Sequence, residues 1–198
     1  MFNRLTPILA IDIETGGCRA LQHPLVAIGI CLCLPHPTGI IKTKKRFTFE
    51  FDTDKFEDRC WCEFWTNHQD KLEIYKSTKE KSTIQDFADY IDTLDNMYPN
   101  LMLISDNPSF DIYFLNTLYD RDLNRKPLLY RADGTYRLIC DQNTYLYAMM
   151  KESKSLWISD ADVIKKYQLE DTIQSKHDHY PENDAERIAD LFIAVRSK

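Results

Sequence analysis

The apolar residues in the first quarter of the chain fall into short runs with the spacing of β-strands. Residues 8–13 form one run of mostly branched side chains, and residues 25–34 form a longer one. Phenylalanines then alternate with polar residues over 46–51. Short runs rich in branched and aromatic side chains are typical of strands. We therefore predict three antiparallel strands that open a sheet, with residues 34–39 connecting the second strand to the third.

Helical periodicity dominates the rest of the chain. Over 83–97 the apolar residues form one stripe, and Ser82 or Thr83 can cap a helix there. Residues 101–105 are almost entirely apolar and predict a buried strand, and residues 137–140 predict another short one. Further helical segments are expected over 56–75, 109–119, 143–150, 159–167 and 183–195. This order predicts an α/β fold, in which helices cover a sheet of mixed strand directions.

The overall composition is that of an ordinary globular protein, with 198 residues of which 43% are apolar and 28% are charged. We expect one domain over 1–198, with a helical insertion near 56–75. No apolar run could span a bilayer, and the N-terminal residues do not resemble a secretory signal peptide. The sequence thus predicts an intracellular, most simply cytoplasmic, protein with no membrane partner.

The net charge of −6 at pH 7 is unhelpful for a protein that coats long nucleic acid through phosphate contacts, but net charge alone neither establishes nor excludes nucleic acid as a partner. It is compatible with an enzyme whose acidic residues hold cations and whose polyanionic substrate arrives over a local basic rim. Charged runs are more often solvated surface than binding sites. The candidate phosphate contacts are Lys42, Lys44, Lys45 and Arg46, or Arg121, Arg125, Lys126 and Arg131.

The six cysteines include two C-x-C pairs, Cys31 with Cys33 and Cys60 with Cys62. Because cysteine is a common zinc ligand, these pairs raise the hypothesis of a structural zinc site, although paired cysteines in such sites are usually spaced more widely. Cys31 and Cys33 also fall on one face of the second predicted strand, where cysteine behaves as a small apolar residue. Reduced intracellular thiols are the favoured interpretation, with zinc as the alternative.

An acidic pair lies on the first predicted strand. Asp12 and Glu14 are two residues apart, so their side chains point to one face while Ile11 and Ile13 point to the other. Neighbouring carboxylates repel each other unless a cation lies between them. The pair is therefore a candidate metal site, and the simpler alternative is a solvated strand end.

Two more acidic residues lie near the starts of predicted helices. Asp111 follows the strand at 101–105, and Asp184 opens the last helix. An acidic residue in a first helical turn often only stabilises the helix dipole. His179 precedes Asp184 in a polar loop, where a histidine is commonly solvated. The nearby His177 has a different spacing to Asp184, and we treat it as a loop residue.

Taken together, these segments resemble the three motifs of the DEDDh 3′→5′ exonucleases, a family that includes polymerase proofreading subunits, RNase T and oligoribonuclease. The order and spacing of the motifs agree, and three linked motifs are far more specific than one. The resemblance implies an RNase H-like fold, with a mixed five-stranded sheet flanked by helices, over nearly the whole chain. The residues that carry it are Asp12, Glu14, Thr15, Gly16 and Gly17 for the first motif, Asn107, Phe110 and Asp111 for the second, and His179 and Asp184 for the third.

This chain departs from the family pattern at three points. Ser105-Asp106 stands where many members have Gly-His before the second motif. The first motif ends in Gly-Gly-Cys, whereas a leucine often follows the glycine and wedges against the terminal base. The insertion near 56–75 has no counterpart in the smallest members and is similar to a tryptophan-bearing helix of phage and bacterial exonucleases.

The resemblance also implies a reaction. Two Mg²⁺ ions, which Mn²⁺ can replace, would be held by carboxylates, and an imidazole would act as general base. The substrate would be the 3′ end of single-stranded RNA or DNA. Related enzymes often form homodimers, and the sequence leaves the oligomeric state open. The alternative is a catalytically silent module with the same fold that binds nucleic acid or protein.

Each matching residue has an implied role. Asp12 would bridge the two ions, Glu14 and Asp184 would complete one site, Asp111 would serve the other, and His179 would be the general base. Thr15, Gly16, Gly17, Asn107 and Phe110 would bind substrate, although anchoring its helix in the core is the simpler role for Phe110.

Overall fold

The computed structural model describes residues 6–131, 133–150, 159–175 and 177–197. Its strands are β1 (Ile8–Thr15), β2 (Leu25–His36), β3 (Gly39–Thr48), β4 (Met102–Ser105) and β5 (Leu138–Asp141). They form one five-stranded sheet in the order β3-β2-β1-β4-β5. The β1–β2 and β2–β3 pairs are antiparallel, and the β1–β4 and β4–β5 pairs are parallel. The expected mixed sheet of five strands is confirmed.

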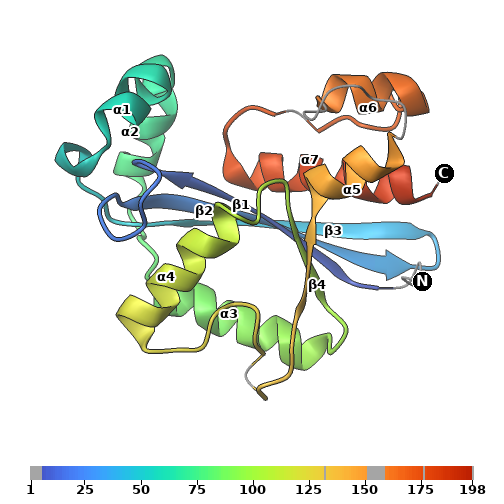
Figure 1. The fold of residues 1–198 in the computed structure, drawn as a ribbon, viewed down its shortest axis with the longest axis horizontal. Helices are drawn as coiled ribbons and strands as arrows, with labels where there is room; N and C mark the ends of the chain where they lie inside the picture. Colours follow the sequence, from blue (N-terminus) through green and yellow to red (C-terminus); the bar gives the residue numbers. More distant parts are fainter. Residues whose placement is uncertain (1–5, 132, 151–158, 176, 198) are drawn as a thin grey trace.

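Helices cover both faces of this sheet. Those of the described residues are α1 (Asp58–Glu63), α2 (Gln69–Ser77), α3 (Ile84–Met97), α4 (Asp111–Leu123), α5 (Gln142–Met149), α6 (Asp160–Tyr167) and α7 (Pro181–Arg196). Figure 1 shows α3 and α4 on one side of the sheet and α5, α6 and α7 on the other. Within the described ranges, no helix is both long enough and apolar enough to cross a membrane.

The alternation of side chains along β1 explains these two layers. Leu9 and Ile11 point into the core beneath α3 and α4, whereas Ala10 packs on the opposite side against the apolar stripe of α7. A strand has a side-chain period of two, so the even positions Asp12 and Glu14 continue along the α7 side. The acidic pair therefore lies on the α7 side of the sheet.

The third strand differs from its predicted position. It is Gly39–Thr48, and β2 continues to His36, so the boundaries 46–51 and the connection 34–39 were wrong. β3 lies at the edge of the sheet and carries a run of exposed charged residues, a common property of edge strands. Those charges removed the apolar alternation on which the prediction depended.

The segment predicted to be helical near 56–75 forms α1, α2 and a short 3₁₀ turn, Trp65–Asn67. Trp65 is only 1% exposed and packs in an apolar cluster that includes Tyr75. Its indole Nε1 donates a hydrogen bond of 3.0 Å to the carbonyl of Thr15. Trp65 is therefore a core residue that ties the insertion to the end of β1.

The remaining predicted elements have the expected type, with ends shifted by a few residues. α3 begins after Thr83, whose hydroxyl accepts from the backbone of Asp86, while the Asp86 carboxylate accepts from the backbone N–H of Thr83. This reciprocal capping box fixes the start of the helix. Near its other end, buried Asp95 forms ion pairs with Arg131 and Arg137, which hold the segment before β5.

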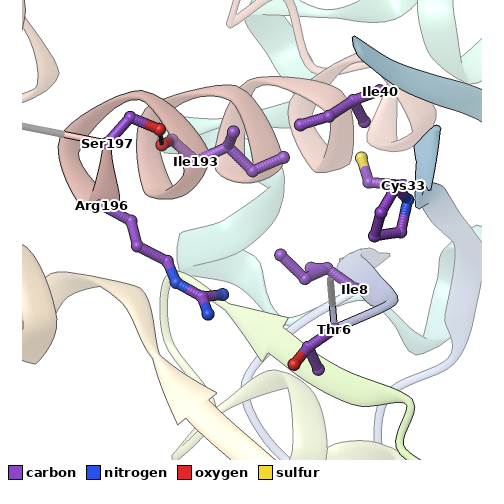
Figure 2. A pocket seen from close by; sticks show the side chains of 8 residues that line it. Thr6, Ile8, Cys33, Ile40, Ile193, Arg196 and Ser197 are labelled. Carbon is purple, nitrogen blue, oxygen red and sulfur yellow. Dashed lines mark hydrogen bonds between the residues drawn. The ribbon is translucent and has the colours of Figure 1, made fainter. Parts of the chain in front are cut away.

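A small cavity of about 180 Å³ lies at the C-terminal end of α7. Ile8, Cys33 and Ile40 from three strands face Ile193 of α7 across it (Figure 2). The residues predicted to act in catalysis lie at the other end of α7, so this cavity is separate from them.

Candidate active site

Three of the predicted acidic residues meet at the start of α7. Carboxylate oxygens of Asp12, Glu14 and Asp184 all lie within 4.8 Å of one another. Two of these residues come from the first strand and one from the last helix, so only the folded chain brings them together. We call these three residues the carboxylate cluster.

A glycine on β2 allows this close approach. Gly29 is the cross-strand partner of Asp12, and a Cβ atom at Gly29 would lie 1.8 Å from the carbonyl carbon of Pro181. Only a residue without a side chain leaves that space free. The first turn of α7 therefore rests directly on the sheet, which places Asp184 beside β1.

The turn before α7 fixes Asp184 and His179 relative to each other. The backbone N–H groups of Asp178 and His179 donate to the two oxygens of Asp184, each over 3.0 Å. His179 has a φ of 58°, in the left-handed region, and its carbonyl accepts a hydrogen bond of 3.0 Å from the Tyr75 hydroxyl. Asp184 thus organises this turn as well as lying in the carboxylate cluster.

The fourth predicted acidic residue, Asp111, lies beside the cluster. It is the first residue of α4 and only 3% exposed. The hydroxyl of Ser105, at the end of β4, donates to its carboxylate. The charge of Asp111 also contributes to the raised pKa of both Asp12 and Glu14, so it acts electrostatically on the same site.

The pKa values of the four acidic residues are all raised, so simultaneous ionisation of the group is unfavourable. Burial is the main cause that raises the pKa of Asp12 and of Glu14 well above the usual range, and repulsion among the acidic groups adds to it. Burial also raises the pKa of Asp111 to about 8 and that of Asp184 to about 6. Such a group of acids is stabilised when a cation binds between them.

The imidazole ring of His179 lies close to three other aromatic rings. Its ring centroid is 5.0 Å from that of Phe64, 4.5 Å from that of His68 and 4.6 Å from that of His177. Burial lowers the pKa of His179 to about 4, and the positive charges of neighbouring histidines and of Lys71 act in the same direction. The imidazole is therefore neutral at pH 7, as a proton acceptor must be.

Open space adjoins the carboxylate cluster. A pocket of about 420 Å³ is bordered by Asp12 and Asp184 of the cluster, and by Asp106, His177 and Arg187. Ligand pockets commonly fall in the range of about 300–1,000 Å³. A ligand in this pocket would therefore lie directly against the acids.

The donor set fits a hard divalent cation. Every donor in the carboxylate cluster is an oxygen, the ligand that Mg²⁺ and Mn²⁺ prefer. Lys71 of α2 lowers the pKa of Glu14, against the larger upward effect of burial and the other acids. The side chain of this lysine is only 13% exposed. The ammonium group of Lys71 therefore places one positive charge of the chain close to the carboxylate cluster.

The predicted substrate residues of the first motif have clear structural contacts. The Thr15 hydroxyl donates to the carbonyl of Gly17 over 2.9 Å. A Cβ atom at Gly16 would lie 2.5 Å from the ring of Phe56, and one at Gly17 would lie 2.7 Å from Glu57. Both glycines are thus required for close packing within this chain, and their contact with a nucleotide stays a prediction.

Of the two predicted substrate residues of the second motif, one lies at the surface and the other packs against the core. Asn107 is exposed, and its side-chain oxygen accepts a hydrogen bond of 2.6 Å from the Ser109 hydroxyl. Phe110 is partly buried and packs against the core, with its ring centroid 6.0 Å from that of Phe114. These contacts agree with the core role favoured for Phe110, while a role in substrate binding for either residue stays a prediction.

Most of the candidate phosphate contacts form ion pairs within the chain. Lys42 and Lys44 of β3 reach Glu186 of α7 over 3.3 and 2.8 Å, and Arg46 reaches Glu182 over 3.3 Å. These pairs join the edge strand to α7. In the second group, the arginines form pairs of their own, namely Arg121 with Asp122, Arg125 with Asp92, and Arg131 with Asp95.

The C-x-C pairs have no zinc-binding geometry in the part of the chain that the structure describes. Neither pair belongs to a cluster of three potential metal ligands there. Cys31 and Cys33 are buried free thiols whose sulfur atoms lie 3.8 Å apart. Their hydrogen bond and their burial raise the pKa of Cys33, which keeps it protonated. These two cysteines are small core residues, as the strand pattern indicated.

Sequence reasoning missed three side chains of this site. His177 was treated as a loop residue, yet its Nε2 lies 3.5 Å from Oδ2 of Asp184. His68 and Lys71 lie in the insertion, far from every motif in sequence. Only the packing of α2 beside His179 and Tyr180 reveals them, and no local pattern could have found them.

Comparison with solved structures identifies the architecture. The chain matches product-bound exonuclease I with a TM-score of 0.64 at 15% identity, covering 98% of this chain and 44% of that one. It matches S. pombe Pop2p in its Mg²⁺- and Mn²⁺-bound form with a TM-score of 0.65 at 15% identity, covering 98% and 84%. E. coli exonuclease I in complex with a dT13 oligonucleotide gives a TM-score of 0.56 at 16% identity, covering 97% and 40%. The chain has the RNase H-like fold of these solved structures.

This likeness is one of fold. No family model matches the sequence, and no curated protein matches it. The chain spans less than half the length of exonuclease I. The RNase H-like sheet implied by the sequence motifs is nevertheless confirmed, and the motif residues of the carboxylate cluster lie at one site within it.

Proposed function

We propose that this protein is a metal-dependent 3′→5′ exonuclease of the DEDDh type, which hydrolyses phosphodiester bonds of RNA or single-stranded DNA. The observation that carries the proposal is the meeting of Asp12, Glu14 and Asp184, with buried Asp111 beside them and neutral His179 on the turn before α7. An arrangement of buried acids with strongly raised pKa values is costly without a cation.

The carboxylates would hold the metal ions. Asp12 would contact both ions, Glu14 and Asp184 would complete the site of one, and Asp111 would serve the other. Two Mg²⁺ ions held there would supply an activated water and would neutralise charge that develops on the phosphate. Mn²⁺ prefers the same oxygen ligands and would substitute. The metal-bound form of S. pombe Pop2p, which shares the fold, supports this extension.

His179 would remove the proton from the attacking water. It is neutral at pH 7 because burial lowers its pKa to about 4, so its free nitrogen can accept a proton. A base this weak is poorly matched to neutral pH. The negative charge of a bound phosphodiester would raise the pKa of the imidazole and the positive charge of bound metal ions would lower it, so the two together would set its working pKa.

The pocket beside the cluster would receive the 3′-terminal nucleotide. Asn107, which is exposed, directly follows the pocket-lining residue Asp106, and the first-motif turn at Thr15, Gly16 and Gly17 closes the end of β1. E. coli exonuclease I, which shares the fold, binds a single-stranded DNA oligonucleotide. The six cysteines are free thiols, in keeping with an enzyme of a reducing intracellular compartment such as the cytoplasm.

The test uses 5′-labelled oligonucleotides of RNA and DNA, single-stranded and double-stranded, with Mg²⁺ or Mn²⁺. The expected result is a ladder that shortens from the 3′ end on single strands and requires the metal. The Asp12→Asn variant should produce no ladder, whereas Asp120→Asn, an exposed acid of α4, should match the parent chain. Binding of oligonucleotide without any hydrolysis, under all these conditions, would instead favour a silent binding module.

A further inference from the structure

A second group of potential metal ligands lies beside the carboxylate cluster. Nitrogen atoms of His177 and His179 and an oxygen of Asp184 all lie within 4.8 Å of one another. His177 borders the pocket but has no assigned role in the proposed hydrolysis, and its side chain is 62% exposed. The group therefore includes one residue that the nuclease reaction does not explain.

The spacing between His177 and Asp184 suits tetrahedral coordination. Zn²⁺ binds histidine nitrogen and carboxylate oxygen at about 2.0–2.2 Å, which in a tetrahedron separates two ligand atoms by about 3.4 Å. Nε2 of His177 lies 3.5 Å from Oδ2 of Asp184. That distance is close to one edge of such a tetrahedron, without movement of either side chain.

The second imidazole and the carboxylate are also held in place. The His177 and His179 rings are tilted by 60° with their centroids 4.6 Å apart. Backbone N–H groups of Asp178 and His179 fix both oxygens of Asp184. Partners that orient metal ligands in this way typically strengthen binding by 10–100-fold. The turn before α7 thus positions all three donors together.

The chemistry of the donors separates this group from the carboxylate cluster. Two imidazoles and one carboxylate form the ligand set of many zinc sites that keep a fourth, open position. Mg²⁺ prefers a set made of oxygens. The two groups share Asp184, so a zinc ion held here would take a ligand from the Mg²⁺ site and would bind a ring nitrogen of His179, the proposed base.

We propose that His177, His179 and Asp184 form a Zn²⁺ site, and that zinc bound there inhibits the nuclease. The inhibitory part rests on the proposed function, whereas the binding part does not. Zinc at this site removes the general base and competes with Mg²⁺ for Asp184. Of the three proposed zinc ligands, only His177 has no role in the proposed hydrolysis, and it completes the zinc ligand set beside His179 and Asp184.

The other mixed cluster of the described residues provides a matched control. Cys18, His23 and Glu57 also place ligand atoms within 4.8 Å of one another. Nδ1 of His23 already accepts the backbone N–H of Arg19 over 3.1 Å. An imidazole nitrogen has one lone pair, so this hydrogen bond would have to break before that nitrogen could bind a metal.

The binding test needs no substrate. The full chain, His177→Gln and Cys18→Ser are titrated with Zn²⁺ in competition with a chromophoric chelator. The expected result is one zinc ion per parent chain, at least about tenfold weaker binding in His177→Gln, and unchanged binding in Cys18→Ser. Circular dichroism verifies that the variants are folded, which the exposure of His177 leads us to expect. Equal affinity in the parent chain and His177→Gln, or loss of binding in Cys18→Ser, would overturn the proposal.

A second measurement tests inhibition. Each protein's Mg²⁺-dependent hydrolysis at rising Zn²⁺ is expressed relative to its own zinc-free rate. The zinc concentration for half-inhibition should rise at least about tenfold in His177→Gln, and equal inhibition would overturn the inhibitory role. If no hydrolysis occurs without zinc while zinc binding depends on His177, the proposed nuclease function fails and the zinc site stands.

Discussion

Removal of divalent cations should make the stability of this protein fall as the pH rises through neutrality. Burial raises the pKa of Asp111 in the folded chain to about 8, whereas an unfolded chain has an aspartate pKa of about 3.9. The folded state therefore binds this proton more tightly than the unfolded state. The stability that the protonated carboxyl supports is present at low pH and is lost as the pH approaches 8.

The magnitude follows from the width of the pH window. Each pH unit over which only the folded state holds the proton changes the free energy of unfolding by about 1.4 kcal/mol. Between pH 6.5 and 8.0, Asp111 alone lowers stability by about 1.5–2 kcal/mol. The raised pKa values of Asp12 and Glu14 act with the same sign. His179, with its pKa lowered to about 4, opposes the loss by only a few tenths of a kcal/mol in this window, because its unfolded pKa is about 6.5.

Urea unfolding at pH 6.5 and pH 8.0, in EDTA and in excess Mg²⁺, measures the effect. In EDTA the protein should be less stable at pH 8.0. In Mg²⁺ the loss should be offset, because a cation that binds only the folded state stabilises it by mass action. Asp111→Asn should shrink the pH effect, and Asp120→Asn on the same helix should leave it unchanged. Stability in EDTA that is flat or rises between these pH values would refute the reasoning.

Three substitutions test other parts of the account. His179→Ala should lower turnover by about 10²–10⁴-fold with much less effect on Mn²⁺ affinity; unchanged single-turnover rates would mean that another group accepts the proton. Gly29→Ala should destabilise the fold by about 1–3 kcal/mol or more in urea unfolding, because its Cβ would lie 1.8 Å from Pro181, and parent-like stability would contradict that contact. Asp95→Asn should cost about 3–5 kcal/mol, since it leaves the buried guanidinium of Arg137 unpaired; a thermal melt like that of the parent would show the pair to be dispensable.

The sequence predicted best those elements whose signals are local. The apolar stripe after Thr83 and its capping box identify α3 without knowledge of the rest of the fold. The alternation on β1 predicted correctly that Asp12 and Glu14 share one face, because a strand's period of two needs no tertiary information. The motif order then indicated which distant residues should meet, and the carboxylate cluster has that arrangement.

Elements that depend on tertiary partners were harder to predict. β3 has few apolar residues, and its Lys42 and Lys44 are stabilised by Glu186 of α7, far away in the sequence. The same lysines had been candidates for phosphate contacts. A charged run on an edge strand and a nucleic-acid rim have the same sequence pattern, and only the ion pairs distinguish them.

The sequence pattern also did not reveal the structural roles of individual residues in the site. Gly29 gives no turn signal, yet it sets how closely α7 approaches the sheet. His177 lacks the motif spacing to Asp184 but lies beside it, because the turn at 178–179 folds back onto that carboxylate. Such contacts arise from backbone hydrogen bonds, which side-chain patterns do not encode.

Anomalous scattering from crystals soaked in Mn²⁺ tests the central claim most directly. The account predicts a Mn²⁺ peak coordinated by Asp12, Glu14 and Asp184, with no peak there in crystals of Asp12→Asn. A parent crystal that binds Mn²⁺ only elsewhere, or an unchanged peak in the variant, would contradict the claim that these carboxylates form the metal site.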